Sequence, residues 1–141
     1  MRFLLDTCLL SEATRPSPAP RVMQWLSEVE ETKTFLSAIT IGELAQGIAQ
    51  LPNGRKRNRL SEWLHDDLLL RFTGRTLAID AAVMLAWGEL VAGLRAKGRV
   101  LPILDSLIAA TAVHHGLTVV TRNTADFGGA GVKTFYPWGE S

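Results

Sequence analysis

The sequence has little cysteine and no long apolar run, and each absence excludes a class of protein. With one cysteine, Cys8, in 141 residues, the chain cannot form an internal disulfide and is not a disulfide-stapled secreted domain. No apolar run approaches the ~20 residues that cross a bilayer. The apolar start, MRFLLDTCLL, contains Asp6 and no small-residue cleavage site follows it, so a signal peptide is not expected. These absences favour a protein of the reducing cytoplasm without a membrane partner.

An excess of charge of either sign is also missing, since Lys and Arg number 15 and Asp and Glu number 14. A net charge of +1 neither demands nor excludes a nucleic-acid partner, so local charge has to decide that question. No linker, repeat or low-complexity run divides the chain, and 47% of its residues are hydrophobic, enough to bury a core. We therefore expect one globular domain over residues 1–141.

What the sequence does contain is an alternation of short apolar segments with segments of helical periodicity. Leu117 to Thr121 (LTVVT) suits a buried parallel strand, and it follows a helix pattern from Ser106 to His115 that Gly116 ends. The other expected strands are 2–5, 34–37, 77–79 and, at an edge, 132–135. The other expected helices are 8–13, 21–30, 40–49, 55–70 and one that Asp80 caps, ending near Lys97. This alternation predicts a three-layer α/β domain with a mainly parallel sheet.

Four acidic residues lie where an expected strand ends or the next helix begins. Asp6 follows the first strand, Glu43 the second and Asp126 the fourth, while Asp105 opens the late helix. Carboxyl ends of parallel strands share one edge of a sheet, so these side chains should converge. Each close pair costs roughly 1 to 4 kcal/mol, which a cation must offset. An all-oxygen set fits Mg²⁺ or Mn²⁺ better than zinc, and such an ion commonly binds phosphates and activates water.

Each of these acids also has a purely structural interpretation. Glu43 could close a capping box with Thr40, in the pattern T-x-x-E. Asp105 could be a helix N-cap, and Asp6 and Asp126 could be turn residues. Spacing alone leaves the choice between a metal site and these local roles open.

Four segments, in this order along the chain, carry a family resemblance. They are LLDTCLLSE at 4–12, LSAITIGELAQGI at 36–48, LPILDSLIAATA at 101–112 and TRNTADF at 121–127. Together they resemble the signature segments of PIN domains, especially the VapC/FitB branch of toxin ribonucleases. The segments GRVLP at 98–102 and YPW at 136–138 extend the likeness across the chain.

The resemblance implies a Rossmann-like α/β/α PIN fold with a five-stranded parallel sheet. It implies a Mg²⁺- or Mn²⁺-dependent endoribonuclease, the toxin of a type II toxin-antitoxin system, with RNA as substrate and a small cognate antitoxin as partner. Carried over by position, four carboxylates would be the catalytic and metal-binding residues, with three residues in support. The carboxylates are Asp6, Glu43, Asp105 and Asp126, and the supporting residues are Thr7, Thr121 and Asn123. Cys8 departs from the pattern, because this branch usually has Asn there.

The resemblance and the number of large apolar residues together suggest a homodimer, which an antitoxin would convert into a larger hetero-oligomer. Trp25, Trp63 and 68–70 exceed what one small core obviously needs. A basic cluster, Arg55, Lys56, Arg57 and Arg59, has two interpretations. It could contact RNA or an acidic antitoxin segment, or it could be a solvated helix face.

Two other functional classes stay open at this point. An aspartyl-phosphate phosphotransferase would use Asp6 as its nucleophile, but a second Asp is expected where Cys8 stands. A non-catalytic PIN-fold module would keep the fold and regulate through an antitoxin-like partner, and Cys8 is the residue that favours it.

Overall fold

The computed structural model describes residues 1–139 and contains a five-stranded sheet in which all neighbouring strands pair in parallel. The strands are β1 (Phe3–Leu5), β2 (Thr34–Ser37), β3 (Thr76–Leu77), β4 (Thr118–Val120) and β5 (Thr134–Phe135). Their order across the sheet is β3-β2-β1-β4-β5, so β1 is central. The predicted five-stranded parallel sheet is confirmed.

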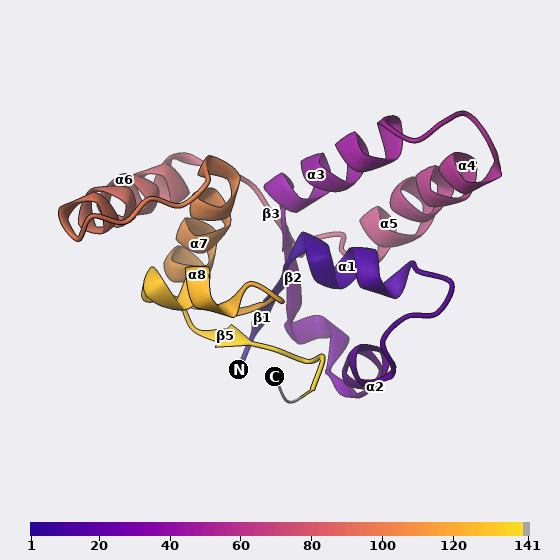
Figure 1. The fold of residues 1–141 in the computed structure, drawn as a ribbon, viewed down its shortest axis with the longest axis horizontal. Helices are drawn as coiled ribbons and strands as arrows, with labels where there is room; N and C mark the ends of the chain where they lie inside the picture. The colour runs from indigo at the N-terminus through magenta and orange to yellow at the C-terminus, as the bar shows by residue number, and fades with distance from the viewer. Residues whose placement is uncertain (140–141) are drawn as a thin grey trace.

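Helices connect the strands and cover both faces of the sheet (Figure 1). Those on one side are α6 (Ala81–Ala96), α7 (Ile103–His115) and α8 (Thr124–Gly129). Those on the other side are α1 (Thr7–Ala13), α2 (Pro20–Glu28), α3 (Ala38–Ala49), α4 (Arg55–Glu62) and α5 (Leu69–Arg71), with a 3-10 turn η1 (Glu31–Lys33) and a π-helical segment η2 (Trp63–Leu68). The three-layer α/β/α arrangement is therefore confirmed.

Several helix boundaries differ from those expected. The late helix α7 begins at Ile103 rather than Ser106, because the chain is already extended at Pro102 and turns helical directly after it. The expected single helix over 55–70 contains the π-helical turns of η2. Helix α8 was not predicted, since its sequence TADFGG ends in two glycines and has low helix propensity. Within residues 1–139, none of the helices has both the length and the apolar character that a bilayer crossing requires.

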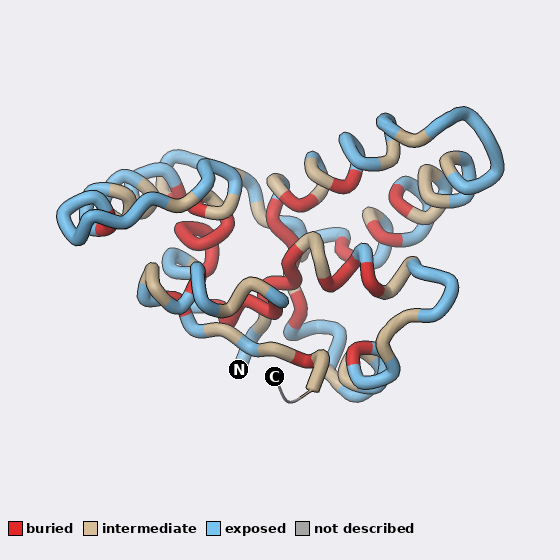
Figure 2. The backbone as a smooth tube through the Cα atoms, viewed as in Figure 1, coloured by how far each residue is buried: buried red, intermediate tan, exposed pale blue. Residues whose placement is uncertain are grey.

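The central strands bury both faces, and successive residues serve opposite layers. Leu5 and Val120 pack with α1, α2, α3, η2 and α5, whereas Leu4 and Val119 pack with α7 and α8. All four are at most 2% exposed, and Figure 2 shows buried residues concentrated along the central strands and the inward faces of the helices. This two-sided burial explains why the strands are continuously apolar rather than alternating.

The pairing of β1 with β4 sets the position of the polar residues that follow both strands. Leu5 is in register with Val120, and the Asp6 N–H donates to the Val120 carbonyl at 3.0 Å. Asp6 and Thr121, the next residues, are therefore neighbours at the carboxyl edge. The chain runs from β1 to one side and returns to β4 on the other, so this edge is also the topological switch point, where open α/β sheets bind ligands.

Helix α3 starts earlier than expected, with Ser37 as its N-cap. The Ser37 hydroxyl accepts a hydrogen bond from the Ile39 N–H at 3.1 Å. Thr40 lies inside the first turn, and its buried hydroxyl has no hydrogen-bond partner among residues 1–139. The capping box considered for Thr40 and Glu43 is therefore wrong, because Thr40 is not the N-cap.

This arrangement predicts opposite effects for two hydroxyl deletions. Ser37→Ala should lower the free energy of unfolding by about 0.5 to 2 kcal/mol, because it removes the N-cap. Thr40→Val should leave that free energy unchanged or raise it, because it removes a buried donor that makes no bond. Urea denaturation followed by circular dichroism measures both. If Thr40→Val instead lowered the free energy of unfolding more than Ser37→Ala does, Thr40 would be the N-cap.

Candidate active site

Asp6 is the most firmly held of the predicted site residues. It is 8% exposed and forms the N-cap of α1. Its Oδ1 accepts from the Thr7 N–H at 2.9 Å, and its Oδ2 accepts from the Thr121 hydroxyl at 2.7 Å. The Cys8 thiol adds a weak contact to Oδ2 at 3.6 Å. Donors from two strand ends thus fix the orientation of this carboxylate.

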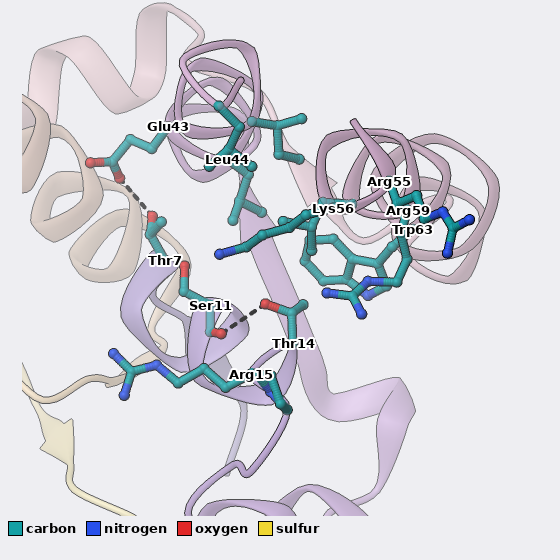
Figure 3. Close-up of a pocket in the computed structure, with 15 residues that line it drawn as sticks. Thr7, Ser11, Thr14, Arg15, Glu43, Leu44, Arg55, Lys56, Arg59 and Trp63 are labelled. Atoms are coloured by element: carbon teal, nitrogen blue, oxygen red, sulfur yellow. Dashed lines mark hydrogen bonds between the residues drawn. The ribbon is translucent and has the colours of Figure 1, made fainter. Parts of the chain in front are cut away.

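Thr7 connects Asp6 to the second carboxylate. Its hydroxyl donates to Glu43 Oε1 at 2.7 Å, while its backbone N–H binds Asp6. Glu43 lies beyond the first turn of α3, and Figure 3 shows its side chain directed toward Thr7. One threonine therefore holds two carboxylates through two different groups.

Asp105 lies in the first turn of α7 and is half-buried. Pro102 is the N-cap position of this helix, so the interpretation of Asp105 as an N-cap is wrong. Burial raises the pKa of Asp105, and the negative charges of Asp6, Glu43 and Asp126 raise it further. The four acids therefore share one electrostatic neighbourhood.

The four carboxylates are near one another without forming a closed cage. Among residues 1–139, no three acidic, histidine or cysteine side chains stand at the spacing of direct ligands to one ion. Asp126 is exposed in the first turn of α8, in a helical segment rather than the turn considered for it. Asp6 and Asp126 thus mark the enclosed and the open end of the acidic group.

Thr121 and Asn123 support the site from the loop between β4 and α8. Thr121 is fully buried, and its hydroxyl also accepts from the Asn123 N–H at 3.0 Å. The Asn123 side chain makes no capping bond to α8, although it occupies the N-cap position. The Asn123 N–H is the group that bonds within this site, and support from the Asn123 side-chain amide stays a prediction.

Cys8 lies inside this network and not beside it. Its sulfur accepts from the Arg122 N–H at 3.3 Å and lies 3.7 Å from the Thr121 hydroxyl. Burial raises the pKa of the Cys8 thiol, and the charge of Asp6 raises it further. The thiol therefore stays protonated near neutral pH and supplies one weak donor toward Asp6.

A cavity of about 770 Å³ lies between α1, α3 and α4, next to the acidic edge (Figure 3). Thr7 and Glu43 line it on the acidic side, and its apolar lining includes Leu44 and Trp63. Its basic lining residues are Arg15, Arg55, Lys56 and Arg59. Arg57 is not among the lining residues, and its guanidinium donates to Asn53 Oδ1 at 2.6 Å. The basic cluster of the sequence thus divides between the cavity and the helix surface.

Sequence reasoning missed a second carboxylate on α1, Glu12. Its hydrogen-bond partners Arg122 and Trp138 are 110 and 126 residues away along the chain. No local spacing pattern signals such a contact, and only the burial of a glutamate, which sequence does not report, distinguishes it.

Comparison with known proteins finds relatives that are named as toxins and ribonucleases. The PIN domain family matches residues 3–129. The chain is 42% identical over 136 residues to Toxin FitB of Neisseria gonorrhoeae, covering 96% of this chain and 98% of FitB. It is 36% identical over 136 residues to VapC ribonuclease Y4jK of Sinorhizobium fredii, covering 96% of this chain and 97% of that protein. The crystal structure of FitAcB from Neisseria gonorrhoeae superposes with a TM-score of 0.92 at 42% identity, covering 96% and 98% of the two chains.

The raised pKa of Asp105 predicts a pH-dependent gain in stability for Asp105→Asn when divalent ions are chelated. At pH 3 the variant and the wild type should melt together, because pH 3 lies below the ordinary pKa of an aspartate and Asp105 is largely protonated whether the chain is folded or unfolded. As the pH rises to 7, ionisation destabilises only the folded wild type, so the melting temperature of the variant should equal or exceed that of the wild type. Thermal scans by circular dichroism at pH 3, 4, 5, 6 and 7 measure the difference. A variant that loses stability relative to wild type with rising pH would contradict the coupling.

Proposed function

The chain belongs to the PIN-domain family, and we propose that it is the toxin of a type II toxin-antitoxin system, a Mg²⁺- or Mn²⁺-dependent endoribonuclease of the cytoplasm. Its similarity to Toxin FitB and to a VapC ribonuclease supports the ribonuclease activity. The observation that carries the proposal is the coupling of Asp105 to Asp6, Glu43 and Asp126 at the carboxyl edge of the sheet. We take residues 1–141 to form a single PIN domain.

The donor set fits a hard divalent cation. Its carboxylate oxygens are the ligands that Mg²⁺ and Mn²⁺ prefer, and the mutual repulsion of the carboxylates favours a cation among them. Their open spacing suits an ion that keeps several water ligands, as Mg²⁺ does. We expect Asp6, Glu43, Asp105 and Asp126 to hold it. When bound, the ion would neutralise phosphate charge and lower the pKa of a water molecule.

The chain's own contribution is to fix the carboxylates before RNA arrives. Thr7 and Thr121 hold Asp6 in one orientation, and Thr7 also orients Glu43. Such preorganisation avoids reorganising the site during the reaction. Hydrolysis adds the water oxygen to phosphorus and breaks one P–O ester bond, and the leaving oxygen takes up a proton.

The basic cavity lining supplies a place for a polyanionic chain beside the acids. Arg55, Lys56 and Arg59 line the cavity that Glu43 borders. We propose that they contact the RNA backbone or an acidic segment of the antitoxin. Arg57, bonded to Asn53 outside the cavity, should contribute less to these contacts.

As partners we propose a second copy of the chain and a cognate antitoxin, which together form a larger hetero-oligomer. Of the residues from which a homodimer was expected, Leu68 is buried and Trp25 and Trp63 pack against the core, so only Leu70, 67% exposed, offers a free apolar surface. A larger exposed apolar set lies on α6, at the start of α7 and in the loop between them. Its members are Met84, Leu85, Val100, Ile103 and Leu104. These side chains are the better candidates for the dimer contact.

The site assignment predicts loss of RNA cleavage in two conservative variants. Asp105→Asn and Glu43→Gln should lower the Mg²⁺-dependent rate by on the order of 100-fold or more, because neutral amides are poor Mg²⁺ ligands. Both should also show a smaller Mg²⁺-induced rise in melting temperature. Asp80→Asn is the matched control: Asp80 follows β3 and caps α6 through the Val83 N–H at 3.0 Å, and Asn caps nearly as well.

Cleavage of labelled total RNA, with Mg²⁺ or with chelator, is the measurement for all three variants. Retained metal-dependent cleavage by both Asp105→Asn and Glu43→Gln would overturn the site assignment. A folded wild type that cleaves no RNA under any of these conditions would favour the non-catalytic binding module instead.

The partner proposal predicts that an antitoxin tail inhibits by placing a cation among the carboxylates. A tail peptide carrying Arg should reduce cleavage, whereas the same peptide with Arg replaced by Ala should reduce it far less. Light scattering at tens of micromolar should give the mass of a dimer. A monomer at that concentration would count against the homodimer, and equal inhibition by both peptides would count against the Arg contact.

A further inference from the structure

A buried carboxylate without a part in the proposed chemistry lies in α1. The side chain of Glu12 is 6% exposed, which is rare for glutamate unless it is paired. Its Oε1 accepts from Arg122 Nη2 at 3.0 Å and from the Trp138 indole N–H at 3.1 Å, and its Oε2 accepts from the Ala19 N–H at 3.3 Å. The hydrogen bond from Trp138 lowers the pKa of Glu12 against the opposing effect of burial. Glu12 is therefore a carboxylate that joins four segments of the chain.

Arg122 is held in this network by two different contacts. Its guanidinium pairs with Glu12 and also lies over the Trp138 ring, with Cζ 4.6 Å from the ring centroid. A planar guanidinium satisfies both contacts at once, which an ammonium group does not. The Arg122 side chain is 51% exposed, yet Glu12 holds the edge of its guanidinium and Trp138 contacts the face.

The same loop residue adjoins the group that holds Asp6. Arg122 directly follows Thr121, whose hydroxyl donates to Asp6 Oδ2 at 2.7 Å. Asp6 is the N-cap of helix α1, and Glu12 lies near the other end of this helix. The loop from Thr121 to Asn123 is thus attached to α1 through Thr121 and Asp6, through the Arg122 N–H and Cys8, and through the Arg122 side chain and Glu12. Loss of the attachment to Glu12 would leave Arg122 held to α1 by its backbone alone and so loosen the neighbouring Thr121 hydroxyl relative to Asp6.

We propose that Glu12, acting through Arg122, is a positioning residue for the acidic site. It fixes residues 121–123 against α1 and so keeps the Thr121 hydroxyl on Asp6. Groups that orient the principal side chains of a site in this way commonly change activity by about 10- to 100-fold when they are removed. The effect on turnover rests on the proposed function, whereas the effect on the loop does not.

Two variants and a matched control test the positioning role. Glu12→Gln and Arg122→Gln each remove one charge of the pair, and Arg122→Gln leaves Glu12 with its bonds from Ala19 and Trp138 and its ion pair with Arg15 at 3.7 Å. Arg71→Gln is the control, because Arg71 pairs with Glu31 at 3.1 Å and is 58% exposed, close to the 3.0 Å and 51% of Arg122.

Amide hydrogen exchange, measured by NMR with chelator present, reports the loop without any need for activity. The Thr7 N–H donates to Asp6 and the Asn123 N–H donates to Thr121, so both should exchange about tenfold faster in the two variants. The Val119 N–H, which bonds to the Lys133 carbonyl inside the sheet, should exchange as in wild type. A purely structural role would accelerate Val119 as well, and that result, or unchanged exchange at Thr7 and Asn123, would overturn the proposal.

Steady-state cleavage of RNA supplies the second readout. Both variants should lower kcat by about 10- to 100-fold with less than about threefold change in KM, and Arg71→Gln should match wild type. Arg122→Lys should recover part of kcat, since it keeps the charge beside Glu12. Faster exchange with unchanged kcat would overturn the catalytic part of the positioning role. A wild type without any cleavage would refute the proposed function, and exchange alone would then decide whether Glu12 positions the loop.

Discussion

The parallel pairing of β1 with β4 is the constraint on which the rest of the site depends. Leu5 opposite Val120 makes Asp6 and Thr121 neighbours, and the 2.7 Å hydrogen bond between their side chains follows from that register. A slip of one residue would move Leu4 and Leu5 to the wrong faces of the sheet, each of which is now packed against its own layer of helices. The packing of the two apolar cores therefore specifies the position of Asp6 and Thr121.

The carboxylates at the acidic edge lower the stability that the two apolar cores supply, because they repel one another. The pKa of Asp105 is raised by its burial and further by the charges of Asp6, Glu43 and Asp126, so ionising it in the folded chain is unfavourable. Residues that keep the charges in place are correspondingly well bonded. Thr7 holds two of the carboxylates and Thr121 holds one, so two hydroxyl groups do much of the positioning.

Charge of the opposite sign lies directly beside this edge. Glu43 borders both the acidic group and the cavity, and Lys56 extends from α4 toward α1 across that cavity (Figure 3). A polyanion that binds along the basic lining would have part of its charge neutralised there, next to the carboxylates. This arrangement, with basic contacts for binding and acids for a cation, suits the proposed cleavage of a phosphodiester.

The sequence alone determined the α/β class, the five strands, most helices and the Asp80 cap of α6, because periodicity and capping depend on residues a few positions apart. It also named the acids, through four ordered segments. Only the tertiary structure decided how those residues act: that Glu43 binds Thr7 instead of capping α3, that Asn123 contributes its backbone, and that Arg57 lies outside the cavity. The partners of Glu12 were beyond sequence reasoning altogether, since they are 110 and 126 residues away. The physical reason is that a local pattern reports which face a residue takes, whereas its hydrogen-bond partners depend on which strand ends and helices the sheet order brings together.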